Sequence, residues 1–139
     1  MKNIKSIISV FVICCLCFCM IGCAEDDEFD PIGVRVVENI SGKQYEGSVN
    51  DKETTQKLWN RFIDLDIDEE EKGEMGTAYI YFCFYDDAGS NLGIFTMYEN
   101  GSCCLGEDFE TFYVIPDGVQ VYTDLCGIYT EYKQNNKEK

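Results

Sequence analysis

The sequence contains no histidine among its 139 residues. Histidine is the commonest general base, it activates serine and cysteine nucleophiles, and it supplies most catalytic zinc sites. Its absence argues against these hydrolase mechanisms and against catalytic zinc. No glycine-rich phosphate loop follows a predicted strand either, so the sequence does not support nucleotide chemistry.

Basic residues are scarce, because 11 lysines and arginines stand against 26 aspartates and glutamates. Nucleic-acid binding depends on basic side chains that neutralise phosphates, and protein contact with anionic lipid has the same requirement. We therefore expect no nucleic-acid partner and no electrostatic contact with a membrane. The acidity is interpreted as solubility at a surface.

We predict no cofactor and no metal site. Asp64, Asp66 and Asp68 alternate as at the start of a calcium loop. However, Glu69 stands where such a loop needs glycine, and Met75 stands where it needs a bidentate acid. The segment 64–76 is therefore interpreted as a solvated charge run.

The apolar stretch near the N-terminus is too short for a membrane span. Residues 7–21 are apolar except for Ser9, whereas a bilayer-spanning helix needs roughly 20 such residues. Lys2 and Lys5 precede the stretch, as in a secretory signal. It ends in Met-Ile-Gly-Cys at positions 20–23. This ending resembles the lipobox of bacterial lipoprotein precursors, with methionine where the family usually has leucine.

The resemblance implies cleavage before Cys23 and a diacylglycerol on its sulfur. The mature protein would then be attached to the cell membrane by lipid and would face outward. An ordinary signal peptide and an uncleaved signal anchor are the alternatives. Removal of residues 1–22 takes away two lysines and no acid, which leaves nine basic against 26 acidic side chains.

The remaining chain is long enough for one domain. We predict a signal peptide over 1–22, an acidic tether over 23–32, a single domain over 33–133 and a disordered tail over 134–139. The apolar pattern predicts a strand or loose hairpin over 33–49 and a helix over 52–65 capped by Asp51. Strands are predicted at 77–86, 91–98, 102–106 and 111–115, and a second helix at 118–133. The predicted class is α+β, an antiparallel meander with one or two helices packed on it.

Asn100 and Gly101 predict a two-residue hairpin. In that register Met97 faces Cys104 and Tyr98 faces Cys103. The face predicted to be buried against the helices holds Phe82, Phe84, Phe95, Met97 and Cys104. The other face holds Tyr79, Tyr81, Cys83, Tyr85, Ile94, Tyr98 and Cys103.

Four tyrosines of that second face form a candidate recognition surface, because aromatic side chains are enriched at interfaces. They are Tyr79, Tyr81, Tyr85 and Tyr98. The alternative is that a helix or the first strand covers them.

The cysteines of the domain leave two interpretations open. A disulfide between Cys104 and Cys126 would join the sheet to the covering helix, as expected outside the cytoplasm. Buried free thiols are the alternative. A thiol-redox site is not indicated, because no C-x-x-C pair is present in the domain.

The predicted function is that of a membrane-tethered, extracytoplasmic lipoprotein with a small acidic domain that binds a partner and is not an enzyme. The alternative is a small carboxylate-dependent hydrolase of the cell envelope. The architecture is similar to that of many small, uncharacterised lipoprotein domains of low-GC Gram-positive bacteria.

Overall fold

The computed structural model describes residues 2–3, 30–107 and 109–137. The predicted signal peptide, Cys23 and most of the predicted tether lie outside these residues. The strands are β1 (Lys2–Asn3), β2 (Gly33–Ile40), β3 (Lys43–Val49), β4 (Asp66–Ile67), β5 (Tyr79–Tyr85), β6 (Asn91–Tyr98), β7 (Ser102–Leu105) and β8 (Tyr113–Val114). The helices are α2 (Lys52–Ile63) and α3 (Gly118–Lys137).

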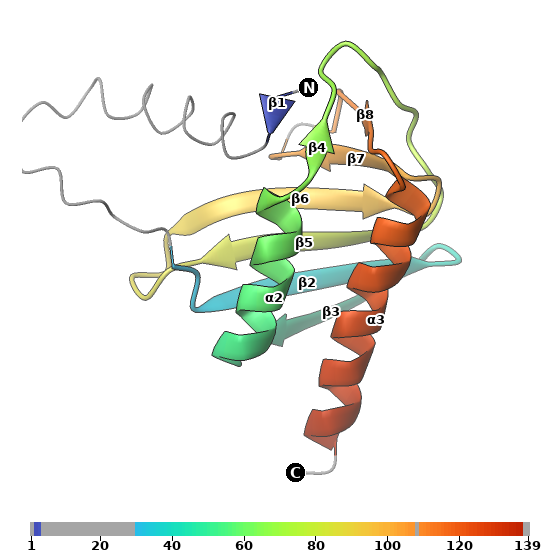
Figure 1. The fold of residues 1–139 in the computed structure, drawn as a ribbon. Coiled ribbons are helices and arrows are strands. Elements are labelled where there is room, and N and C mark those ends of the chain that lie inside the picture. Colours follow the sequence, from blue (N-terminus) through green and yellow to red (C-terminus); the bar gives the residue numbers. More distant parts are fainter. Residues whose placement is uncertain (1, 4–29, 108, 138–139) are drawn as a thin grey trace, which may run out of the picture.

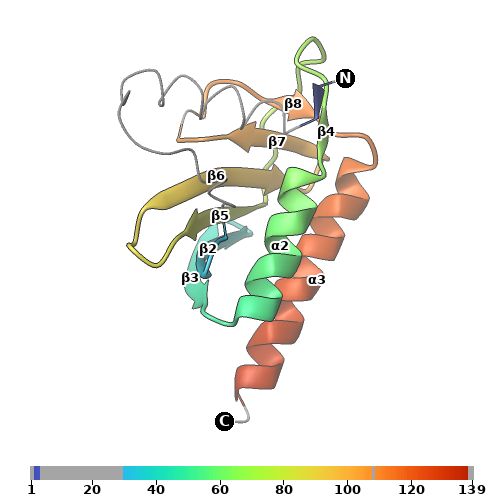
Figure 2. The same cartoon turned by 60° about the vertical axis from the view of Figure 1, so that its left-hand side comes forward.

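The main sheet has the strand order β3-β2-β5-β6-β7-β8, and every neighbouring pair is antiparallel. Strand β2 is therefore internal, between its hairpin partner β3 and the much later β5. Helices α2 and α3 run antiparallel to each other across one face of this sheet (Figures 1 and 2). The predicted α+β class, with a meander and helices packed on it, is confirmed.

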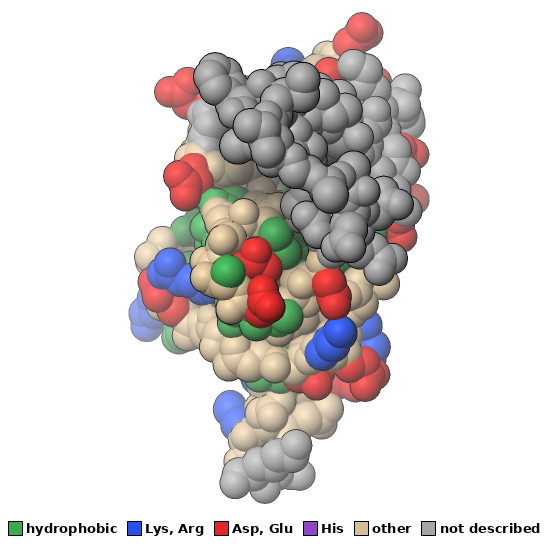
Figure 3. Space-filling model, turned by 90° about the vertical axis from the view of Figure 1, so that its left-hand side faces the viewer, with side chains coloured by type: hydrophobic (Ala, Val, Ile, Leu, Met, Phe, Trp, Pro, Cys, Tyr) green, Lys and Arg blue, Asp and Glu red, His purple; other side chains and the backbone are tan. Residues whose placement is uncertain are grey.

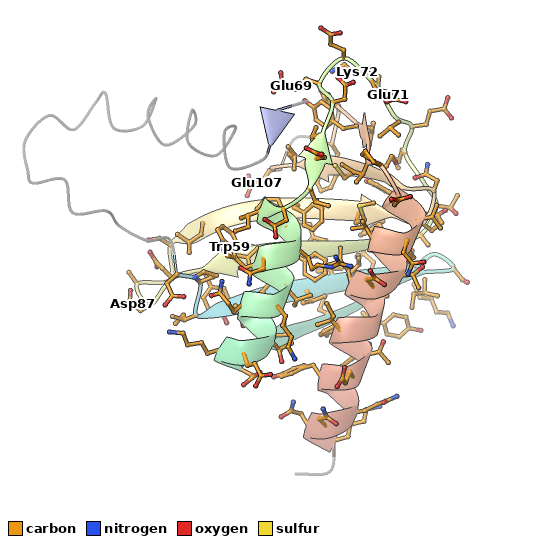
Figure 4. All side chains as sticks on the ribbon, viewed as in Figure 1. Trp59, Glu69, Glu71, Lys72, Asp87 and Glu107 are labelled. Atoms are coloured by element: carbon orange, nitrogen blue, oxygen red, sulfur yellow. The ribbon has the colours of Figure 1, made fainter. Side chains whose placement is uncertain are left out.

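Helix α2 begins where the sequence predicts. The Asp51 carboxylate accepts a hydrogen bond of 2.8 Å from the backbone N–H of Thr54, which is an N-cap. The apolar stripe of the helix then meets the sheet, and the Phe62 ring lies 4.8 Å from the Phe95 ring. On the same face, Trp59 lies 5.0 Å from Phe84 (Figure 4).

The phenylalanine face of the sheet is the buried one, as predicted. Four of its side chains are completely inaccessible, and these are Phe82, Phe84, Phe95 and Met97. They form one core cluster with Leu58 of α2 and Leu125 of α3. Burial of this many apolar side chains is the main stabilising contribution to the fold.

The turn between β6 and β7 differs from the prediction. Met97 is opposite Cys103, so the loop has three residues, not two, and the predicted pairing of Met97 with Cys104 is wrong. Only Gly101 has a positive φ, +88°, and its N–H donates to the Tyr98 carbonyl. This geometry is a type I turn followed by a left-handed residue. The side chain of Asn100 bonds Ser102 and the Glu74 carbonyl instead of requiring a left-handed backbone.

This one-residue shift exchanges the two cysteines of β7 between the faces of the sheet. Cys103 joins the core cluster beneath the helices, whereas Cys104 lies opposite Thr96 on the other face. The predicted faces of β5 and β6 are unaffected, because they follow from alternation within each strand.

Two segments, one predicted to be a solvated charge run and one predicted to be disordered, contain ordered structure. In the segment 64–76, Leu65 and Ile67 are buried in the core, and Asp66–Ile67 form β4, which pairs with β1. The predicted disordered tail is wrong for residues 134–137, because α3 continues to Lys137.

Candidate functional site

One face of the sheet is covered by neither α2 nor α3, and we call it the helix-free face (Figure 2). Directly opposed residues of antiparallel strands point to the same side, so the register defines its members. Its main members are Gly33, Arg35, Val37, Asn39, Gln44, Glu46, Ser48, Tyr79, Tyr81, Cys83, Tyr85, Ile94, Thr96, Tyr98 and Cys104. The four tyrosines of the candidate recognition surface all come from β5 and β6, but they differ in burial and in their contacts.

Tyr98 is buried, with 2 % of its surface exposed. Its ring lies 5.7 Å from that of Tyr79 and 5.7 Å from that of Phe112, each edge to face. Burial raises the pKa of Tyr98 to about 12. Tyr98 is therefore a packing residue and is not available to a partner in this structure.

Tyr79 and Tyr85 are half-buried and held by hydrogen bonds within the chain. The Gln44 side chain donates to the Tyr79 hydroxyl at 2.7 Å. The Tyr85 hydroxyl donates to the Asn50 side-chain oxygen at 2.8 Å, and its ring lies so close over Gly33 that a Cβ there would overlap it. These contacts hold both rings in place within the chain.

Tyr81 lies at the centre of the helix-free face, between Val37 of β2 and Thr96 of β6. Burial, and after it the neighbouring Cys83 thiol, raise the pKa of Tyr81. The phenol is therefore a neutral hydrogen-bonding group at ordinary pH. Beside it, Arg35 and Glu46 form an exposed ion pair of 3.0 Å.

This face also carries buried oxygens without a hydrogen bond. Among the residues that the structure describes, three buried side-chain oxygens have no partner, and two of them, Asn39 Oδ1 and Thr96 Oγ1, lie here. Such groups are uncommon in folded proteins and cost free energy unless they are satisfied.

The cysteines do not form the predicted bond between Cys104 and Cys126. Cys126 is a free, half-buried thiol on α3, and Cys104 is on the opposite side of the sheet. Burial raises the pKa of Cys103 to about 12 and also raises the pKa of Cys126. A thiol nucleophile needs a lowered pKa, so these two are packing residues.

A second candidate region was not found from the sequence. A groove of about 700 Å³ lies between the start of α2 and the end of α3. Its polar lining includes Asn50, Thr54, Lys57, Glu131, Tyr132 and Asn136. The contact between Asn50 and Tyr132 spans 82 residues of sequence, so no local pattern could indicate it.

Two of the three acidic residues of the groove have partners within the chain. Of its acidic residues, Asp51 accepts hydrogen bonds from Thr54, and Glu53 is ion-paired with Lys57 at 3.1 Å.

Acidic side chains outnumber basic ones in the sequence, and they are visible on the described surface (Figure 3). At the end of the sheet where β5 turns into β6, acidic side chains stand among apolar and uncharged ones (Figure 3). Within the described ranges, no group of three or more cysteines and acids is arranged to hold a metal ion.

Among the described helices, none is both long enough and apolar enough to cross a membrane. Comparisons with protein families, with curated proteins and with solved structures found no match to this chain.

Proposed function

We propose that this chain is a bacterial lipoprotein that is cleaved before Cys23 and attached to the outer side of the cell membrane by lipid. Its domain binds a protein partner and catalyses no reaction. The anchoring part of the proposal is supported by the short apolar run that ends in Met-Ile-Gly-Cys. Cleavage at this point would also remove β1 from the mature protein.

The binding part of the proposal is supported by the helix-free face around Tyr81. Tyr79 and Tyr85, which lie on the same strand and face as Tyr81, are pre-positioned by hydrogen bonds to Gln44 and Asn50. The two unpaired oxygens of Asn39 and Thr96 distinguish this face from an ordinary solvated sheet surface. A partner that covers the face would bury the exposed parts of Tyr79, Tyr81 and Tyr85.

The anchoring is tested with Cys23→Ala. The parent should enter the detergent phase of a phase-separation experiment, and the variant should remain in the aqueous phase, because it has lost both acyl chains. A variant that remains as membrane-bound as the parent would identify residues 7–22 as an uncleaved anchor.

The binding face is tested with Tyr81→Ala in the anchored protein. Crosslinking in intact membranes should give a defined adduct with the parent and much less with this variant. The matched control is Tyr122→Ala, which removes a half-buried tyrosine from α3 on the other side of the sheet. Equal adduct yields from the two variants would show that the helix-free face is not the binding surface.

A further inference from the structure

The two edges of the sheet differ in whether another segment of the described chain covers them. At the β8 edge, residues 71–73 run alongside the strand. Gly73 N–H donates to the Phe112 carbonyl at 2.8 Å, and Lys72 forms a bridge with Tyr113. The Lys72 ammonium also lies 4.7 Å from the Tyr113 ring centre (Figure 4). This edge is therefore covered, which is how native sheets avoid unwanted strand pairing.

The β3 edge has no such cover among the described residues. Strand β3 is seven residues long, contains no proline, and pairs with β2 without a bulge. Ser41 and Gly42, with φ of 54° and 77°, form a two-residue turn. In such a hairpin Lys43 is in a hydrogen-bonded pair with Ile40, and alternate residues then point their backbone groups outward.

The outward-pointing residues of β3 are Gln44, Glu46 and Ser48. No hydrogen bond within the described ranges uses their backbone N–H or C=O groups. A regular edge of this length, with three residues offering both donors and acceptors, is a template for an added strand.

Helix α3 determines what can occupy this template. Its last turns project beyond β3 (Figures 1 and 2). There the Lys133 ammonium bonds Glu38, and the Tyr132 hydroxyl accepts from the backbone N–H of Asn50 at 3.4 Å. A segment added beside β3 would lie under this overhang (Figures 1 and 2). A second copy paired through β3 would bring its own α3 to the same edge, which favours a single extended segment as the occupant.

The charges near β3 indicate the chemistry of the segment. The hairpin 33–49 is neutral, with Arg35 and Lys43 against Glu38 and Glu46. Beyond the end of β3, the groove adds three carboxylates, those of Asp51, Glu53 and Glu131, against one lysine. An added strand would therefore run from a neutral edge toward an acidic groove, which favours cationic side chains.

We propose that the β3 edge binds an extended, basic segment of a partner protein by strand addition. Backbone hydrogen bonds to Gln44, Glu46 and Ser48 hold the segment, and its basic side chains reach the acidic groove. The site consists of backbone groups at the edge of the sheet, whereas the side chains of Gln44 and Glu46 contact Tyr79 and Arg35 on the helix-free face. It depends neither on that face nor on lipid anchoring.

The test is fluorescence anisotropy with the full-length chain in non-ionic detergent micelles. The probe is a labelled ten-residue peptide of alternating lysine and valine. A second peptide has the same sequence but is N-methylated throughout its central residues, which keeps the charge and removes the backbone donors. We expect the second peptide to bind at least about tenfold more weakly, because several hydrogen bonds are lost.

The matched variants are Glu46→Pro and Glu46→Ala. Both remove the carboxylate, but only proline removes an outward N–H, and Tyr45 and Gly47 still pair with β2. Glu46→Pro should weaken binding about tenfold relative to Glu46→Ala, with a similar melting temperature for the two. Ser48→Pro and Ser48→Ala repeat the comparison in case Glu46→Pro does not fold.

Four results would overturn the proposal. Equal binding of the two peptides would mean attraction by charge alone, and equal binding by the proline and alanine variants would place the peptide elsewhere. A dimer in light scattering that Glu46→Pro abolishes would mean that β3 pairs with a second copy. Absence of peptide binding at millimolar concentration counts against the proposal in the same way.

Discussion

The carboxylate of Glu38 on β2 accepts a hydrogen bond of 2.6 Å from the ammonium of Lys133 on α3. The Glu38 side chain is 9 % exposed and that of Lys133 is 38 % exposed. The Lys133 ammonium also lies 4.4 Å from the centre of the Tyr129 ring. This pair therefore fixes the last turns of α3 to the sheet.

Lys133→Met should destabilise the domain by about 2 kcal/mol, because Glu38 loses the partner that compensates its burial. The value is below that of a fully buried pair, because Lys133 is partly solvated. The double variant Glu38→Gln, Lys133→Met should lose clearly less stability than Lys133→Met alone. Urea unfolding of these two variants and of the single variant Glu38→Gln measures this, and purely additive losses would mean that the pair contributes nothing to stability.

Phe82→Ala should cost about 3–5 kcal/mol, because it removes a fully buried aromatic ring from the core. Tyr81→Ala, on the half-buried helix-free face, should cost clearly less. Denaturant melts of the two variants compare them directly. A larger loss for Tyr81→Ala would show that the helix-free face is the more tightly packed side of the sheet.

Glu99 should contribute stability that is lost in acid. Burial raises its pKa, but hydrogen bonds from Thr77 and Ala78, three of them at 2.7–2.8 Å, outweigh this and leave the pKa below its ordinary value of 4.5. A lowered folded-state pKa means that the contribution is complete above the unfolded value and disappears as the pH falls through the folded value.

Glu99→Gln should therefore be less stable than the parent at pH 7 by about 1 kcal/mol, since a charged acceptor is replaced by a neutral one. The difference should shrink as the pH falls below the ordinary value of 4.5 and through the lower folded-state pKa. Thermal melts over this range, with Glu70→Gln as the surface control, give the comparison. A difference that stays constant with pH would mean that the charge of Glu99 is unimportant.

The native protein should show no disulfide between Cys104 and Cys126. Cys103 should resist alkylation at pH 8, because its thiol is buried and has a pKa of about 12, and half-buried Cys126 should react slowly. Peptide mass spectrometry after alkylation, with and without prior reduction, measures both. Recovery of a Cys104–Cys126 linked peptide before reduction would require a different placement of β7 or α3.

The position of α2 could be predicted because its signals are local. Asp51 caps the first turn, and Leu58, Trp59 and Phe62 form one stripe, so the start of the helix and its buried side follow from neighbouring residues. The predicted end at residue 65 is two residues too late, because Leu65 and Ile67 continue into the core after the helix stops at Ile63.

The β6–β7 turn shows where local signals are insufficient. Asn-Gly is compatible with both a two-residue and a three-residue hairpin. The choice depends on contacts from elsewhere, because Glu74 accepts from Asn100, and Gly118 packs so closely on Gly101 that a Cβ there would overlap its carbonyl. For this reason the prediction of which sheet face carries Cys103 and which carries Cys104 was wrong.

The sequence by itself determined the α+β class, both helices and which face of β5 and β6 is buried, because alternation and helical periodicity act between residues close in the chain. Only the tertiary structure decided the pairing of β2 with β5, the Glu38–Lys133 ion pair and the α3 overhang beside β3. These contacts join residues far apart in sequence, and their geometry depends on how the whole core packs.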